Sequence, residues 1–143
     1  LNNCFMSGYE KNDLNVYPAL CRFIDNVKIK YPAKNSLLSN PYQKSANKRL
    51  FLFLRWMIRS DDVDPGGWTG ISQDKLIIPL DTHMHKIGIL FGATERKNTG
   101  LAAAFEITDF FKEICPHDPV KYDFSLTRFG IRDELNFDML FDT

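Results

Sequence analysis

The sequence predicts an all-α fold, and three observations support this prediction. Apolar residues recur at spacings of three and four along most of the 143 residues, as in helices that bury one face. Proline and glycine separate these segments, and no alternating pattern indicates a strand meander. With 44% hydrophobic residues the chain can form one core, so we expect a single helical domain over residues 1–143.

Helices are expected in five segments, at about residues 15–30, 45–60, 82–91, 101–115 and 119–130. Asn15 and Asp81 are candidate N-caps for the first and third segments. Asp118 followed by Pro119 is typical of a cap with proline in the first turn, which places the start of the fifth helix there.

Two segments do not fit a helix. Residues 61–72 contain three glycines and one proline, which indicates a loop. Residues 76–80 (LIIPL) are apolar and β-branched but contain a proline, so we expect a buried extended segment that leads into Asp81.

Composition and motifs exclude several functional classes. The three cysteines form no CxxC pair and are too few for a four-thiolate iron–sulfur cluster, so we expect reduced thiols. His83 and His85 face different sides of a helix and His117 is distant, which argues against a zinc site. Phosphate-binding glycine motifs and apolar runs of about 20 residues are absent. We therefore expect no metal, no cofactor and no membrane partner.

The net charge is zero but unevenly distributed. Residues 1–59 carry ten basic and three acidic side chains, a net charge of +7, whereas residues 60–143 carry eight and fifteen, a net charge of −7. The first part would attract a polyanion. The two parts can equally neutralise each other inside one small domain, so both interpretations stay open.

Four basic residues share one edge of the expected second helix. Lys44, Lys48, Arg55 and Arg59 lie within about 60° of one another at 100° per residue. Positions 50–58 are otherwise almost all large and apolar, so this helix should be central, with its other faces buried. Because an unpaired buried charge is costly, the basic edge must face solvent, acidic partners or a ligand.

The basic edge allows two interpretations. The arginines Arg55 and Arg59 can simply pair with the aspartates of residues 61–64 or with helix caps elsewhere. Lys48 lies near the start of the helix, where a cleft can open. A partly desolvated amine flanked by cations loses its proton more readily, as an amine nucleophile requires.

Asp81 allows two compatible roles. As an N-cap, its carboxylate accepts hydrogen bonds from amides of the following turn. A carboxylate held in this way stays ionised and rigidly aimed, so it also suits the stabilisation of positive charge that develops on a sugar.

Three sequence blocks carry a family resemblance. In order, KSANKRLFLFLRWMIRSDDVD, LIIPLDTHMHKIGILFG and HDPVKYDFSLTRFGI resemble a mostly bacterial family known as a domain of unknown function, over about Leu37 to Ile131. That family is in turn similar to the helix-hairpin-helix, Gly/Pro-Asp (HhH-GPD) superfamily of DNA base-excision glycosylases. The archaeal oxidised-guanine glycosylases are the nearest in order and helical placement.

The resemblance implies a DNA glycosylase with AP lyase activity in the bacterial cytoplasm, at the nucleoid, with DNA as partner. In that superfamily a lysine that opens the helix after the hairpin attacks the sugar C1′, and an aspartate that opens a later helix assists. PLDTH places Asp81 at the aspartate, and Lys48 is the first choice for the lysine. Lys44, in KSAN, is the second choice.

The same resemblance implies DNA contacts. Lys44, Arg55 or Arg59 would contact backbone phosphate. Trp68, in the loop between the lysine and the aspartate, would stack on an extruded base, or else would anchor the loop on the core.

The sequence also departs from the superfamily. SNPYQKSA stands where a hairpin of the type LPGVG would be, without a glycine that lets amides approach a phosphate. The chain starts at Leu1 without a start signal, so we expect the C-terminal portion of a longer protein, whose N-terminal helices complete the fold. A non-enzymatic nucleic-acid-binding or structural helical module therefore remains the alternative.

Overall fold

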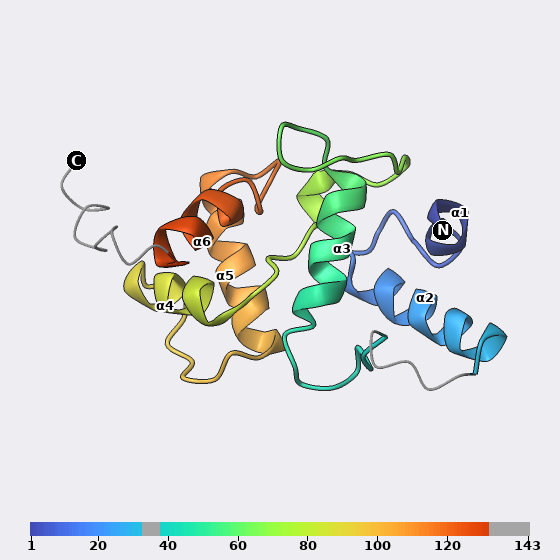
Figure 1. The fold of residues 1–143 in the computed structure, drawn as a ribbon, viewed down its shortest axis with the longest axis horizontal. Coiled ribbons are helices and arrows are strands. Elements are labelled where there is room, and N and C mark those ends of the chain that lie inside the picture. The colour runs from blue at the N-terminus through green and yellow to red at the C-terminus, as the bar shows by residue number, and fades with distance from the viewer. Residues whose placement is uncertain (33–37, 132–143) are drawn as a thin grey trace.

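The computed structural model describes residues 1–32 and 38–131, and every regular element within them is helical (Figure 1). The predicted all-α class is confirmed for these residues. The elements are α1 (Asn2–Met6), α2 (Tyr17–Lys30), α3 (Lys48–Ile58), the short 3₁₀ helix η1 (Gln73–Lys75), α4 (Thr82–Leu90), α5 (Leu101–Ile114) and α6 (Asp123–Ile131).

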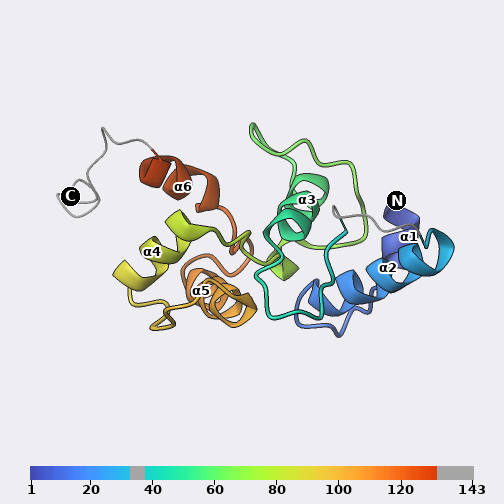
Figure 2. The same ribbon diagram turned by 60° about the horizontal axis from the view of Figure 1, so that its bottom comes forward.

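Helix α3 is the central element, as its apolar composition predicts. Figures 1 and 2 both show it between the α1–α2 pair and the group formed by α4, α5 and α6. Leu50, Phe51 and Leu54 of α3 are buried in the core that joins the two sides. Trp56 is the exception to the predicted burial, because 42% of its surface remains exposed.

The starts of α2 and α3 differ slightly from the prediction. Asn15 accepts a hydrogen bond from the Tyr17 amide at 2.9 Å, and α2 begins at Tyr17 itself. Asn47 adopts a left-handed backbone with φ of 51°, so α3 cannot extend further toward the N-terminus. Lys44 is consequently outside the helix, and its predicted place on the basic edge of one continuous helix is wrong.

The predicted start of the last helix is wrong by four residues. Asp118 and Pro119 belong to a turn in which the Lys121 amide donates to the Asp118 carbonyl at 3.2 Å, and α6 starts at Asp123. The Asp118 carboxylate does not cap a helix because it is bound by Arg59 instead.

The predicted loop at residues 61–72 folds back onto the end of α3. The Gly66 amide donates to the Trp56 carbonyl at 2.8 Å, and the Trp68 amide donates to the Met57 carbonyl at 2.9 Å. These bonds satisfy carbonyls that a helix end leaves open. Gly66 has φ of 69°, which favours glycine at this turn.

Residues 76–80 form the predicted extended segment, and all five are buried. The Ile78 amide donates to Thr108 Oγ1 of α5 at 3.0 Å, which fixes the segment against that helix. At its end, Asp81 Oδ1 accepts the Met84 amide at 2.8 Å and caps α4. A buried, hydrogen-bonded segment thus sets the position of Asp81.

Candidate functional site

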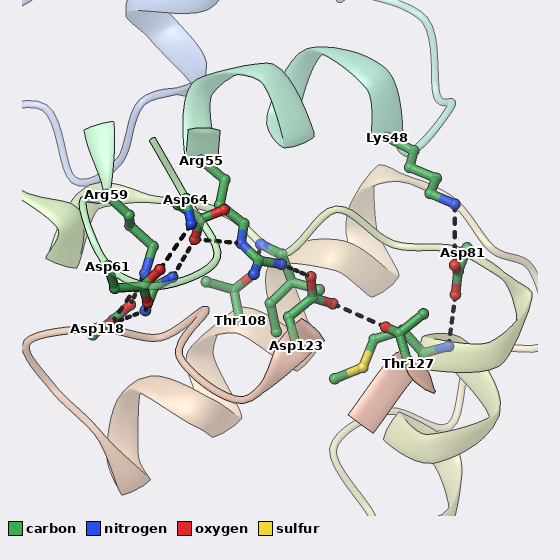
Figure 3. A network of polar contacts seen from close by, with 12 residues as sticks. Lys48, Arg55, Arg59, Asp61, Asp64, Asp81, Thr108, Asp118, Asp123 and Thr127 are labelled. Atoms are coloured by element: carbon green, nitrogen blue, oxygen red, sulfur yellow. Dashed lines mark hydrogen bonds and ion pairs between the residues drawn. The ribbon is translucent and has the colours of Figure 1, made fainter. Parts of the chain in front are cut away.

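Lys48 and Asp81, 33 positions apart in sequence, meet in the fold. Lys48 Nζ lies 3.0 Å from Asp81 Oδ2. Figure 3 shows the two side chains pointing toward each other. The Lys48 side chain is 47% exposed, whereas the Asp81 side chain is 15% exposed. The fold thus brings together the two residues that the resemblance assigns to the reaction, while their roles stay a prediction.

Both side chains of this pair are positioned by the starts of helices. Lys48 is the first residue of α3, directly after the left-handed Asn47. Asp81 uses its two oxygens separately, Oδ1 for the α4 cap and Oδ2 for Lys48. The carboxylate is therefore held by the backbone at one oxygen while the other faces an amine that solvent reaches.

Arg55 lies deeper on α3 than Lys48 and is almost fully buried. Its Nε lies 3.1 Å from Asp64 Oδ2, and its Nη1 lies 2.5 Å from Asp123 Oδ2. Both carboxylates are buried as well. Arg55 thus ties α3 to the loop after it and to the start of α6.

Arg59 makes a second, adjoining set of ion pairs. Its Nη2 lies 2.9 Å from Asp61 Oδ2 and 2.9 Å from Asp118 Oδ2, and its Nη1 contacts Asp64. The interpretation in which both arginines pair with acidic side chains is confirmed for Asp61 and Asp64. Because the two guanidinium groups are buried and paired, we do not include Arg55 or Arg59 in a DNA-contacting surface.

The ion pairs of Arg55 and Arg59 form one cluster, whose buried part contains more carboxylate groups than guanidinium groups. Asp64, Asp118 and Asp123 are three buried carboxylates around the two guanidinium groups. Burial raises the pKa of Asp123 to about 6, against the attraction of Arg55. The negative charge of Asp81 contributes to this rise in the pKa of Asp123, so Asp123 is electrostatically coupled to the Lys48–Asp81 pair.

Lys44 and Trp68 have different surroundings. Lys44 is exposed, at a bend directly before Ser45, which forms an isolated bridge with Gly100. The Trp68 ring packs against Phe5 at 5.3 Å and against Phe53 at 5.6 Å between ring centroids. Trp68 is thus an anchor for its loop, and we do not assign it to base stacking.

Sequence patterns missed two members of the cluster. Asp118 carried the signal of a helix cap, and Asp123 carried no signal at all. Their pairing with Arg55 and Arg59 joins residues 59 and 68 positions apart, which no local spacing encodes. The three cysteines are free, and the described residues contain no group of three or more metal-binding side chains.

Comparison with known families matches residues 1–132 to the family described as "Protein of unknown function (DUF2400)". The chain belongs to this family. The match is longer than the stretch from Leu37 to Ile131 that carries the resemblance, because it includes α1 and α2. No curated protein and no solved structure matches the chain. In the described part of the DUF2400 chain, no helix has the length and apolarity to cross a bilayer.

Proposed function

We propose that this DUF2400 protein is a DNA base-excision glycosylase with AP lyase activity, in which Lys48 is the nucleophile and Asp81 its partner. The observation that carries the proposal is the 3.0 Å contact between the Lys48 amine and the Asp81 carboxylate. In this proposal the family resembles the helix-hairpin-helix glycosylases, whose reaction uses an amine and a carboxylate such as this pair provides. Within the proposal, the all-helical fold corresponds to the glycosylase scaffold.

The proposed first step uses both groups of the pair. Asp81 Oδ2 accepts a proton from the Lys48 ammonium, and the free amine then attacks C1′ of a nucleotide extruded from the duplex. The bond from Nζ to C1′ forms as the bond from C1′ to the base breaks. The electron pair of that bond leaves with the base, which takes up a proton.

The second step gives the covalent intermediate. The bond between C1′ and the ring oxygen breaks, the oxygen gains a proton, and Nζ loses its second proton to leave a Schiff base. Asp81 is suited to both steps because its cap keeps one oxygen fixed while the other faces the amine. Half-exposure of Lys48 lets a nucleotide reach it.

Borohydride trapping on abasic-site DNA tests this proposal, because reduction of the Schiff base leaves a stable protein–DNA adduct. We expect an adduct with the wild-type protein and none with Lys48→Ala or Lys48→Arg. The arginine variant preserves a positive charge beside Asp81 but stays protonated and cannot attack. Lys28→Ala, at an exposed lysine of α2, is the matched control and should give the wild-type yield. An adduct that persists in both Lys48 variants, or none from the wild type, contradicts the proposal.

A non-enzymatic module is the second candidate, and one observation favours it. Both Asp81 oxygens already have partners within the protein, so the pair also serves as a tie between the starts of α3 and α4. Such a module would bind DNA with an affinity that falls as salt rises, but would form no adduct.

A further inference from the structure

A cavity of about 640 Å³ lies beside the chain segment that leads to Lys48. One wall is formed by residues 42–44, which precede α3, and the other by residues 96–105, which form the end of the α4–α5 connection and the start of α5. In Figure 1 both segments run along the same lower edge of the molecule. The volume falls in the range of about 300–1,000 Å³ typical of ligand sites.

The two walls are fastened to each other. The Leu101 amide donates to the Lys44 carbonyl at 3.0 Å, and Ser45 bridges Gly100. A Cβ on Gly100 would lie only 3.0 Å from the Lys44 carbonyl oxygen, so this close approach favours glycine. The cavity is therefore preformed by the fold.

The second wall is also fastened to α4, the helix that Asp81 caps. His85 Nε2 lies 2.7 Å from the Arg96 carbonyl oxygen and donates to it. His85 Nδ1 lies 3.2 Å from the Thr99 hydroxyl, which donates to that nitrogen in this tautomer. Because α4 carries Asp81 at its start and His85 in its second turn, the wall keeps a fixed position relative to the Lys48–Asp81 pair.

The lining combines positive charge with an apolar floor. Lys44 and Lys97 are exposed, and neither has an ion-pair partner among the residues that the structure describes. Arg96 pairs with Glu106 at 2.8 Å, so that pair adds little net charge. Leu101 and Phe105 supply half-buried apolar surface between these polar groups.

We infer that this cavity binds the nucleotide next to the one attacked by Lys48, with its phosphate at the Lys44 and Lys97 amines and its base over Leu101 and Phe105. The inference rests on the proposed function for the position of the attacked nucleotide. Two unpaired amines suit a phosphate, and the apolar floor suits the face of a base, whereas an acidic peptide would leave that floor uncovered. Lys44 precedes Lys48 by four residues, so the segment that lines the cavity leads along the chain to the reacting amine.

Binding of duplex DNA that contains a tetrahydrofuran abasic analogue tests the inference, because this analogue cannot form the Schiff base. We compare Lys44→Gln/Lys97→Gln with Lys11→Gln/Lys28→Gln, which removes two exposed lysines outside the cavity. At about 0.15 M salt, the cavity variant should bind about 5- to 30-fold more weakly, and its salt slope should fall by about one to two. The control variant should retain the wild-type slope.

A second variant tests occupancy without changing charge. Ala102 is exposed and lines the cavity in the first turn of α5, so Ala102→Trp fills the space. We expect about fivefold weaker binding or more, with the wild-type salt slope, because the base loses its place on the floor. Equal binding by Ala102→Trp and wild type, or equal losses in the two double-lysine variants, overturns the inference.

Trapping and DNA binding, taken together, separate this inference from the proposed function. If Lys48-dependent trapping occurs but the cavity variants bind like their controls, the inference alone fails. If no adduct forms while the cavity variants lose DNA binding as expected, the cavity is a nucleic-acid site on a protein without lyase activity. Polyglutamate that binds the wild type but not Lys44→Gln/Lys97→Gln, while the two proteins bind DNA equally, overturns the inference in favour of an acidic peptide.

Discussion

At the scale of single residues, Asp81 combines two tasks that one substitution can separate. Its Oδ1 caps α4 through the Met84 amide, and its Oδ2 contacts the Lys48 amine. An asparagine retains a carbonyl oxygen for the cap but carries no charge to accept a proton from the amine. An alanine removes both functions.

We therefore expect different effects from the two variants on stability but the same effect on trapping. Asp81→Ala should lower the free energy of unfolding by about 1 kcal/mol, and Asp81→Asn by less than about 0.5 kcal/mol. Both should slow adduct formation by about 100-fold or more, because a positioned base contributes about that much. Chemical denaturation and single-turnover trapping measure the two quantities. Trapping at the wild-type rate in Asp81→Asn would show that the carboxylate is only a cap.

At the same scale, the raised pKa of Asp123 makes the free energy of unfolding depend on pH. The pKa of a free aspartate is about 3.9, and burial raises that of Asp123 to about 6. The folded protein therefore binds this proton more tightly than the unfolded chain. The resulting stabilisation is fully present below about pH 4 and is lost as the pH rises through about 6.

Asp123→Asn should remove this pH dependence. We expect the free energy of unfolding of the wild type, minus that of the variant, to fall by roughly 2–3 kcal/mol between pH 4 and pH 7. Urea denaturation at a series of pH values measures the difference. A constant difference would show that the attraction of Arg55 balances burial, and a difference that rises with pH would show that it outweighs burial.

At the scale of elements, the contact between α4 and α5 depends on a glycine. A Cβ built on Gly88 would lie 2.5 Å from Ile107 Cδ1, closer than real atoms approach. Gly88→Ala should therefore cost about 1–3 kcal/mol, despite the better helix propensity of alanine. Ile107→Val removes Cδ1 and should cost about 1 kcal/mol alone.

The double variant Gly88→Ala/Ile107→Val tests this contact. Valine removes Cδ1, the nearer of the two clashing atoms, but keeps Cγ1, which would lie 2.8 Å from the added methyl carbon. Because part of the clash is relieved, we expect the double variant to be more stable than the sum of the single losses by about 1 kcal/mol. Thermal or urea unfolding of the four proteins gives the coupling. Additive losses would mean that the two helices do not contact each other at this point.

The sequence predicts the type of each long element but not all of its limits. Spacing of apolar residues identified the helices because each buries one face of its own. The start of α3 depended on the left-handed Asn47, and the start of α6 depended on Arg59 binding the side chain of Asp118. The first is a backbone conformation and the second a long-range contact, and spacing reveals neither. The contact of Lys48 with Asp81 was predictable only through the family resemblance.

At the scale of the whole molecule, the uneven charge of the sequence is partly neutralised inside the fold. The basic first part contributes Arg55 and Arg59, and the acidic second part contributes the buried aspartates that bind them. Among the surface lysines of the first part, the proposals assign Lys44 and Lys48 to a polyanion. Internal neutralisation thus accounts for the two arginines, and attraction of a polyanion stays a prediction for the surface lysines.

The buried ion cluster should also be needed for global stability. Arg55→Met leaves Asp64 and Asp123 without a shared partner, so we expect a loss of about 3–5 kcal/mol in the free energy of unfolding at neutral pH. Arg22→Met is the control, because Arg22 pairs with Asp13 in a partly exposed position and should cost about 1 kcal/mol or less. Equal losses in the two variants would contradict a structural role for the cluster.

Identification of the trapped lysine tests the central claim most directly. After borohydride reduction on abasic-site DNA, nuclease and protease digestion leave a sugar remnant on the reacting side chain, and mass spectrometry of the peptides locates it. The contact between the Lys48 amine and the Asp81 carboxylate predicts the remnant on Lys48. A remnant on Lys44 or on any other residue, or no modified peptide at all, would contradict it.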